Sequence, residues 1–477
     1  MELHVVIEGK KDLGGQLHGQ LRDAIRSGRL VAGERLPPTR LLAEQLGISR
    51  KTVAEVFARL TRDGLLIGRI GIGTFVSEGM VTRTPPQRTE DLAGAAVVEQ
   101  WRRMATPLRQ MDREGSARYE YIGGVPSGPL FPADDWRRCM LHGLRQFTSS
   151  RSLYGTAEGV PALRQAIARH IAFARGVRCE ADDVIVTAGA QQALDLVARV
   201  LVAPGSTVAI EEPGYPPMRN LLAAQGAHVV GVPVDDEGIV VDAIPAGTRF
   251  IYVTPAHQFP LGMPMSPPRR IALLQRAQEL GAVVIEDDFD SEFRHAGRPT
   301  DTLYSLDTQG TVAYVGTFSK TMSPQLRLGY LIAPPSIRSA VATAKHLTDS
   351  HTAPTQQWAL AKFIDDGLLA RHIRRCHAAY ALRREKLVAR FEGDLAPWFR
   401  LVPAAAGFHI AALCRKPLDV ALLVALARRV DVGLYPLAPF FHFSEPQPGL
   451  MMGYGAIDTL DIDPSLDRVR DILMQIA

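Results

Sequence analysis

Several residues that can do chemistry stand at the ends of apolar segments in the C-terminal part of the chain. Asp287 closes the segment AVVIED, and Lys320 lies 33 residues later, after the segment TVAYVG and the sequence TFSK. Gly189 separates an apolar segment from a helical one, and Tyr215 follows another apolar segment in EEPGYP. Arg327 comes seven residues after Lys320. Binding sites form at such strand ends in sheets whose strands alternate with helices.

This set of groups fits a cofactor that carries a pyridine ring, an aldehyde and a phosphate. A lysine can form a Schiff base with the aldehyde, and an acid opposite the ring nitrogen keeps that nitrogen protonated. An aromatic side chain can stack on the ring, while an Arg, hydroxyl groups and a helix N-terminus can bind the phosphate. Each residue alone also has an ordinary interpretation as a cap, a turn or a solvated surface group. The ordered combination favours the cofactor.

The elements that would position these residues alternate between strand and helix. Helices are expected at residues 191–201 and 269–280, the second ending at Gly281. Because strands separated by helices usually pair in parallel, a mostly parallel sheet with helices on both faces is predicted. The strand candidates are residues 184–187, 208–210, 229–234, 250–254, 282–287, 311–316 and 328–332.

The first eighty residues have a different pattern, that of three short helices. Leu17, Leu21 and Ile25 recur every four residues and mark one face of a first helix. A second helix is expected to end at Gly47, and Ser49 can cap a third. A short helix, a Gly-containing turn and a second amphipathic helix form a helix-turn-helix.

The polar face of the third expected helix begins with Ser49, Arg50, Lys51 and Thr52. In helix-turn-helix proteins the N-terminal residues of the recognition helix face base edges and phosphates. Arg can form paired hydrogen bonds with guanine, while Ser, Thr and Lys suit phosphate oxygens. Two strand-like segments follow and predict a wing with Arg69 at its tip. A small helical domain with a solvated charged face is the alternative that periodicity alone leaves open.

Long segments at both ends resemble known families. The segment LPPTRLLAEQLGISRKTVAEVFARLTRDGLLIGRIGIGTFV resembles the winged helix of the GntR family, with Arg40 on the family's DNA-contacting Arg and Arg69 on its wing. The segments VTAGAQQALDLVARVLVAPGSTVAIEEPGY, VTPAHQFPLGMPMS, VIEDDFDSEFR and YVGTFSKTMSPQLRLGYLIAPP resemble fold type I aminotransferases of the MocR group, from about Tyr121 to the end. The implied fold is multidomain: an N-terminal winged helix (α+β), then an α/β fold type I aminotransferase-like domain with a smaller α+β C-terminal subdomain.

The resemblance implies a role for each matching residue in holding pyridoxal 5′-phosphate (PLP). Lys320 matches the Schiff-base lysine, Asp287 the partner of the ring nitrogen and Tyr215 the stacking ring. Tyr154 matches a Tyr that reaches the phosphate from the neighbouring subunit, so the resemblance also implies a homodimer. The residues that match the phosphate-binding group are Gly189, Ala190, Thr317, Ser319 and Arg327.

The chain departs from the family pattern at three places around the implied cofactor. Phe289 stands where the motif EDDYDSEF has a Tyr whose hydroxyl contacts the ring oxygen. Ala188 and Ala190 remove two hydroxyls from the phosphate loop, which leaves its backbone donors. Met451 stands where the pattern LRLGF has an Arg that receives an amino-acid carboxylate, unless the tail aligns a few residues away.

Met451 bears on which small molecule the domain senses. A carboxylate is costly to desolvate unless a cation pairs with it, and Met offers no donor. Either another cation serves, with Arg219 as the candidate, or the effector is not an ordinary amino acid and PLP itself is a candidate. The second outcome is favoured.

The length of 477 residues suggests several domains, and fractions of 46% hydrophobic and 22% charged residues are those of a globular protein. The expected domains are a DNA-binding domain at 1–79, a linker at 80–118 and the PLP-binding domain at 119–477. The four cysteines are far apart, so neither a cysteine zinc site nor a disulfide framework is expected, and no metal is predicted. With neither a signal peptide nor a membrane span expected, a cytoplasmic location is predicted.

The predicted function is that of a PLP-dependent transcription regulator that binds a double-stranded DNA operator. Its aminotransferase-like domain would sense a small molecule, either an amine or amino compound or PLP itself. The alternative is an active aminotransferase with an appended DNA-binding domain, because Lys320 and Asp287 are competent for a first half-reaction. The missing hydroxyl at Phe289 and the missing Arg at Met451 favour the regulator. A scaffold with a degenerate cofactor site is a third interpretation.

Overall fold

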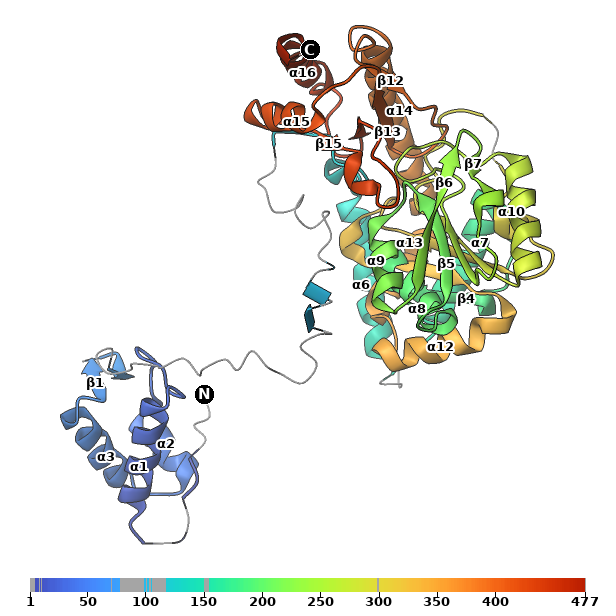
Figure 1. Ribbon diagram of the computed structural model, residues 1–477. Helices are drawn as coiled ribbons and strands as arrows, with labels where there is room; N and C mark the ends of the chain where they lie inside the picture. The colour runs from blue at the N-terminus through green and yellow to red at the C-terminus, as the bar shows by residue number, and fades with distance from the viewer. Residues whose placement is uncertain are drawn as a thin grey trace. The chain divides into compact units, whose positions relative to one another are not determined.

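The computed structural model describes residues 5–7, 9, 11–69, 71–77, 98–99, 101–102, 104, 117–149, 154–297 and 300–476 (Figure 1). The chain divides into two compact units, Met1–Val97 and Val98–Ala477. Most of the expected linker at 80–118 lies outside the described residues, as does Ile70 in the expected wing. The proposed domain boundaries therefore stay a prediction.

The N-terminal unit is a three-helix arrangement with a small antiparallel hairpin, as expected. The apolar faces of the first and third helices meet, so that Leu17, Leu21, Val53 and Leu60 are buried in one core. The elements are α1 (Leu13–Arg26), α2 (Thr39–Leu46), α3 (Arg50–Arg62), β1 (Leu66–Arg69) and β2 (Gly73–Val76).

The turn between α2 and α3 has the local chemistry that the sequence predicts. Gly47 ends α2 with a left-handed φ of 64°, a conformation that glycine adopts without strain. The Ser49 hydroxyl caps α3 by accepting a hydrogen bond from the Thr52 amide at 3.0 Å. The helix-turn-helix prediction is confirmed.

The C-terminal unit is built on a mixed, mostly parallel sheet. Among the described residues its strand order is β4-β11-β10-β9-β8-β5-β6-β7, and the neighbours from β10 to β6 pair in parallel. The predicted strands all form, with ends that differ by at most two residues. Their bounds are β4 (Val184–Thr187), β5 (Thr207–Glu212), β6 (His228–Asp235), β7 (Gly238–Ile239), β8 (Phe250–Val253), β9 (Val283–Asp288), β10 (Val312–Thr317) and β11 (Gly329–Ile332).

Helices cover both faces of this sheet, because successive side chains of a strand point to opposite sides. In β4, Val184 and Val186 pack into the core with α7 and α13, whereas Ile185 packs into the core with α8, α9 and α12. The helices are α6 (Ala133–Ser149), α7 (Pro161–Arg175), α8 (Ala190–Leu201), α9 (Pro216–Ala224), α10 (Pro267–Leu280), α11 (Leu303–Leu306), α12 (Pro335–Asp349) and α13 (Pro354–Asp365).

A smaller subdomain follows in the chain, and its helices surround a second, antiparallel sheet of order β12-β13-β16-β15 (Figure 1). Its elements are α14 (Leu368–Glu392), β12 (Phe399–Leu401), β13 (His409–Cys414), α15 (Val420–Arg429), β14 (Val432–Gly433), β15 (Tyr435–Pro436), β16 (Gly449–Gly453) and α16 (Ile462–Ile476). The early strand β3 (Tyr119–Glu120) pairs in parallel with β14. Within the part of the chain that the structure describes, none of the helices has the length and apolar character to cross a membrane.

A buried ion pair ties the end of α7 to the end of β9. Arg175 Nε lies 2.6 Å from Asp288 Oδ2, and the two side chains are only 7% and 3% exposed. The Tyr314 hydroxyl donates to the same carboxylate oxygen at 2.6 Å. A second arginine of α7, Arg169, makes a contrasting pair with Asp365 in which the side chains are 60% and 46% exposed.

We expect Arg175→Met to lower the free energy of unfolding of the C-terminal unit by about 3–5 kcal/mol, because it leaves a buried carboxylate without its cation. Arg169→Met is the matched control and should cost about 0–1 kcal/mol, since exposed pairs contribute little. Urea unfolding of the full-length variants measures both values. Equal losses in the two variants would contradict this account of the buried pair.

Candidate functional site

A cavity of about 400 Å³ lies at the carboxyl ends of the parallel strands. Side chains from β8, β9, the segment after β10 and the N-terminus of α8 meet there with residues of the smaller subdomain. The predicted cofactor residues that line it are Ala190, Tyr215, Asp287, Thr317, Ser319, Lys320 and Arg327. Residues separated by more than a hundred positions in the sequence therefore converge where the sheet topology predicts a site.

Lys320 lies three residues beyond the end of β10, and its side chain points into the cavity. Its Nζ donates a hydrogen bond to the carbonyl oxygen of Gly124 at 2.7 Å. Burial lowers the pKa of Lys320, while the negative charges of Asp290 and Asp287 oppose this shift. A lysine with a lowered pKa is more often the neutral amine, which is the form that attacks an aldehyde.

Asp287 is buried beside this lysine, near the end of β9. Its Oδ2 accepts a hydrogen bond from the Tyr252 hydroxyl at 2.7 Å, whereas no described residue donates to its Oδ1. Burial raises the pKa of Asp287 to about 6, and the hydrogen bond from Tyr252 and the charge of Lys320 oppose this shift. Near pH 7 the carboxylate is therefore largely ionised, with one oxygen available to a donor in the cavity.

Tyr252 is a site residue that the sequence analysis missed. It stands in the apolar strand FIYV, where a Tyr has the pattern of a core residue. Pairing β8 and β9 as parallel neighbours would have identified it, because this pairing sets Tyr252 opposite Ile285. Asp287 lies two residues beyond Ile285, so its side chain leaves β9 on the same face as the tyrosine.

The group predicted to bind phosphate forms around the N-terminus of α8. Gly189 is the N-cap of this helix with φ of 86°, and a Cβ on it would lie 2.9 Å from an Arg327 guanidinium nitrogen. Arg327 donates to the Ala188 carbonyl oxygen at 2.8 Å. Thr317 and Ser319 line the cavity beside them. A helix N-terminus, a guanidinium and hydroxyls in one place form an anion site.

Part of the cavity lining is apolar. Phe289, Phe259 and Met451 form this part, and Met451 comes from β16 of the smaller subdomain. A Cβ built on Gly123 would lie 2.6 Å from Met451 Cε, so the thioether closes tightly on the 123–124 segment. Met451 is therefore part of the cavity, and among the described lining residues the cations are Lys320 and Arg327.

Two predicted residues are not brought into this cavity. The Arg219 guanidinium contacts the neighbouring Asn220 side chain at 3.2 and 3.3 Å, and Arg219 is not among the described residues that line the cavity. Tyr154 is 75% exposed, with its ring 6.1 Å from the His351 ring. Neither residue contributes to the cavity of its own subunit.

In the N-terminal unit the predicted DNA-contacting residues gather at the start of α3 and on the elements beside it. Arg50 and Lys51 are exposed at the first turn of α3, and Arg40 is exposed at the second residue of α2. Arg69 ends β1 opposite Gly73, and its carbonyl oxygen accepts a hydrogen bond from the Ile72 amide at 3.0 Å across the turn of the wing. Its guanidinium lies 5.0 Å from the centroid of the Phe75 ring on β2.

The cavity fits the cofactor that the sequence predicts. The unpartnered oxygen of Asp287 suits a protonated ring nitrogen, and Lys320 is placed to react with an aldehyde. Because Gly189 has no side chain, the Arg327 guanidinium can lie close against the N-terminus of α8, and both groups suit a phosphate. A cofactor with these three groups satisfies each feature.

Comparisons with known proteins agree with this fit. Residues 128–443 match the aminotransferase class I and II family, and residues 13–76 match the bacterial regulatory proteins of the gntR family. The chain is 36% identical over 462 residues to the probable rhizopine catabolism regulatory protein MocR of Rhizobium meliloti, covering 96% of this chain and 93% of that protein. It is 31% identical to the pyridoxine biosynthesis transcriptional regulator PdxR of Corynebacterium glutamicum, covering 97% and 94%.

A solved structure is similar over the C-terminal unit. It is LysN, the α-aminoadipate aminotransferase of Thermus thermophilus, solved with N-(5′-phosphopyridoxyl)-L-leucine, at a TM-score of 0.71 and 27% identity over 79% of this chain and 97% of that one. The predictions of the family, the fold class and the PLP cofactor are thus confirmed. The chain belongs to the MocR-type regulators of the GntR family, in which a winged helix-turn-helix is joined to a PLP-binding, aminotransferase-like domain.

Proposed function

We propose that this protein is a homodimeric transcription regulator that binds an operator in double-stranded DNA and changes that binding when a small molecule reaches its PLP site. The observation that carries the proposal is the joining, in one chain, of a winged helix with an exposed basic recognition helix to a cavity built around Lys320 and Asp287. We place the DNA-binding domain at 1–79, the linker at 80–118 and the effector domain at 119–477.

Within the effector domain, Lys320 would hold PLP as a Schiff base. When bound, PLP supplies an electrophilic carbon and an electron-withdrawing ring. The free oxygen of Asp287 would accept the ring N–H, and Tyr215 would stack on the ring. Burial raises the pKa of Tyr215 and keeps its hydroxyl neutral. The residues that would bind the phosphate are Gly189, Ala190, Thr317, Ser319 and Arg327.

The proposed homodimer explains the position of Tyr154. Tyr154 is 75% exposed in its own subunit and is not among the described residues that line the cavity of that subunit. We propose that Tyr154 reaches the phosphate of the partner subunit, so that each cofactor site is completed by both chains. A dimer would also carry two winged helices, which suits an operator with two half-sites.

DNA recognition would centre on the first turn of α3. Arg50 and Lys51 are exposed there, and an N-terminal recognition-helix turn is the part that faces base edges and phosphates. The Ser49 and Thr52 hydroxyls lie 2.8 Å apart at the same turn and can reach phosphate oxygens. Arg40 on α2 and Arg69 on the wing would add flanking contacts.

An active aminotransferase is the second candidate, because Lys320 and Asp287 have the geometry that such enzymes need. Two features of the cavity favour the regulator. Phe289 offers no hydroxyl to the ring oxygen, and Met451 offers no cation to a substrate carboxylate. A transaminase must bind two amino acid and keto acid pairs, so a missing carboxylate partner weakens both half-reactions.

The apolar part of the cavity lining also limits which class of small molecule can be the effector. A carboxylate buried beside Phe259, Phe289 and Met451 would lose its hydration without gaining a cation. Arg219, the candidate replacement, contacts Asn220 and is not among the described residues of the cavity wall. We therefore propose that the effector is not an ordinary α-amino acid, and that PLP itself is the leading candidate.

Lys320→Ala should abolish both the visible absorbance band of the bound cofactor and the adduct that sodium borohydride fixes to the protein, because the variant has no amine to attach the aldehyde. Lys362→Ala, which removes a lysine from the surface of α13, should keep both signals. Absorbance spectra and mass spectrometry of the reduced proteins give the readouts. A borohydride adduct that persists in Lys320→Ala would show that another residue holds PLP.

The double variant Arg50→Ala/Lys51→Ala should bind the operator more weakly, with about 1–3 kcal/mol lost for a base-reading Arg. Each lost phosphate contact should also lower the salt slope of log K by about 0.9. The double variant Arg59→Ala/Arg62→Ala removes the same charge from the opposite end of α3 and should have the smaller effect. Fluorescence anisotropy at several salt concentrations measures both. Equal weakening by the two double variants would refute the placement of contacts at the first turn.

Titration of the PLP-loaded protein with alanine, glutamate, γ-aminobutyrate and taurine should leave the visible band in place, because the wall at Met451 provides no cation for the acidic group. Met451→Arg should create one, and an α-amino acid should then shift the band at concentrations that leave the wild type unchanged. Met451→Leu is the size-matched control. A clear shift of the wild-type band by a simple α-amino acid would overturn the effector proposal.

A further inference from the structure

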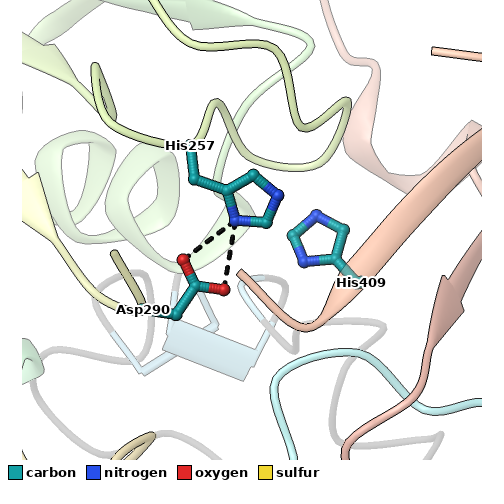
Figure 2. A group of neighbouring side chains, drawn as sticks. All are labelled: His257, Asp290 and His409. Carbon is teal, nitrogen blue, oxygen red and sulfur yellow. Dashed lines mark hydrogen bonds and ion pairs between the residues drawn. The ribbon is translucent and has the colours of Figure 1, made fainter. Parts of the chain in front are cut away.

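A cluster of three buried side chains lies behind the apolar wall of the cavity, formed by His257, Asp290 and His409 (Figure 2). His257 belongs to the segment that follows β8, Asp290 to the segment that follows β9, and His409 is the first residue of β13. Each side chain is about 1% exposed. The proposed PLP and DNA sites use none of the three.

The side chains present potential ligand atoms to one another. One nitrogen or oxygen from each lies within 4.8 Å of those of the other two, and no other such group occurs among the described residues. The rings of His257 and His409 are 4.3 Å apart between centroids. Because zinc–nitrogen bonds are about 2.0 Å long, donor atoms around one zinc ion lie about 3.3 Å apart, so small adjustments would bring these three to one ion.

The Asp290 carboxylate is placed symmetrically toward the imidazole. His257 Nδ1 lies 2.9 Å from Oδ1 and 3.1 Å from Oδ2, as the two dashed lines in Figure 2 show. An N–H group forms its best hydrogen bond with one acceptor along one direction. A metal ion between the imidazole and the carboxylate would instead bind both oxygens at once. Both carboxylate oxygens therefore lie close enough to His257 Nδ1 for one bound cation to contact all three atoms.

The buried Asp290 carboxylate has few polar neighbours. Within the described residues, His257 is the side chain that hydrogen-bonds to this carboxylate, at 2.9 and 3.1 Å. The charge of Lys320 also acts on Asp290, but the lysine amine itself donates to Gly124. Buried carboxylates are usually paired with cations or coordinate metals.

His409 is held in the orientation that a ligand needs. Its Nε2 lies 3.1 Å from the carbonyl oxygen of Pro260, so the ring proton is placed on Nε2 and the lone pair on Nδ1. Metal-bound histidines almost always donate their other N–H to a carbonyl or carboxylate in this way. Close glycines complete the surroundings, since a Cβ on Gly407 would lie 2.1 Å from the His257 ring and 2.6 Å from Asp290.

We propose that His257, Asp290 and His409 form a binding site for Zn²⁺. Two imidazole nitrogens and the two oxygens of Asp290 supply four donor atoms, which is the usual coordination number of structural zinc. Binding through Nδ1 of His257 moves its proton to Nε2, so the imidazole stays neutral and the ion neutralises the carboxylate. The net charge of the filled site is +1.

Such an ion would join the two parts of the effector domain. His257 and Asp290 follow strands of the large sheet, whereas His409 begins a strand of the smaller sheet that also carries Met451 through β16. The His257 ring also stacks on Phe289, with centroids 5.6 Å apart, and Phe289 lines the PLP cavity. Zinc would fix the smaller subdomain against the cavity wall.

The test is the zinc content of full-length, untagged protein purified from cells grown with added zinc chloride, measured by mass spectrometry of the metal. The wild type should hold about one zinc ion per chain. Asp290→Asn and His409→Gln should each retain less than about a tenth of that amount, because each removes a ligand. His377→Gln should keep the ion, since His377 stacks on His295 in a pair that is not part of the cluster.

Thermal unfolding separates the loss of a ligand from the loss of the fold. A chelator should lower the unfolding midpoint of the wild type and of His377→Gln, and leave that of Asp290→Asn unchanged, because only the first two have zinc to lose. A wild type with less than about a tenth of a zinc ion per chain, or equal zinc content in wild type and Asp290→Asn, would overturn the proposal and leave the cluster as a hydrogen-bonded core.

Discussion

The buried carboxylate of Asp287 is the constraint on which the C-terminal unit depends. A charge this far from water is stable only with donors and cations around it. The parallel pairing of β8 and β9 brings the Tyr252 hydroxyl to one oxygen, and Lys320 lies beside it on the segment that follows β10. The remaining oxygen has no partner among the described residues, and in our proposal the ring N–H of PLP would complete the set. The binding of PLP and the stability of the carboxyl ends of β8 and β9 are therefore linked.

Much of this arrangement could be predicted from the sequence because it is local. Helical periodicity located α1 and α3, and apolar segments located the strands of the large sheet. The spacing of Lys320 and Asp287 then predicted the chemistry. Contacts between distant segments could not be predicted in the same way. Tyr252 has the pattern of a core residue, Arg219 turns to Asn220, and the ligands at 257, 290 and 409 share no sequence spacing.

The cavity keeps the residues that fit PLP, but at Met451 it has no cation for the carboxylate of a substrate. This combination suits a ligand-controlled switch better than a catalyst. A ligand shifts a conformational equilibrium only if its affinity differs between the two states. Met451 lies on β16 of the smaller subdomain, while Asp287 belongs to the large sheet and Lys320 follows its strand β10, so whatever fills the cavity contacts both parts. Binding there can change how the two parts pack, and we propose that this change alters DNA binding.

The central claim is that occupancy of the PLP site controls binding to DNA. The most direct measurement is the affinity of the full-length protein for an operator selected from a random DNA library, with and without PLP, in the wild type and in Lys320→Ala. The account predicts a cofactor-dependent change in the wild type of at least about tenfold, or about 1.4 kcal/mol, and none in Lys320→Ala. Equal operator affinity in all four samples would contradict it.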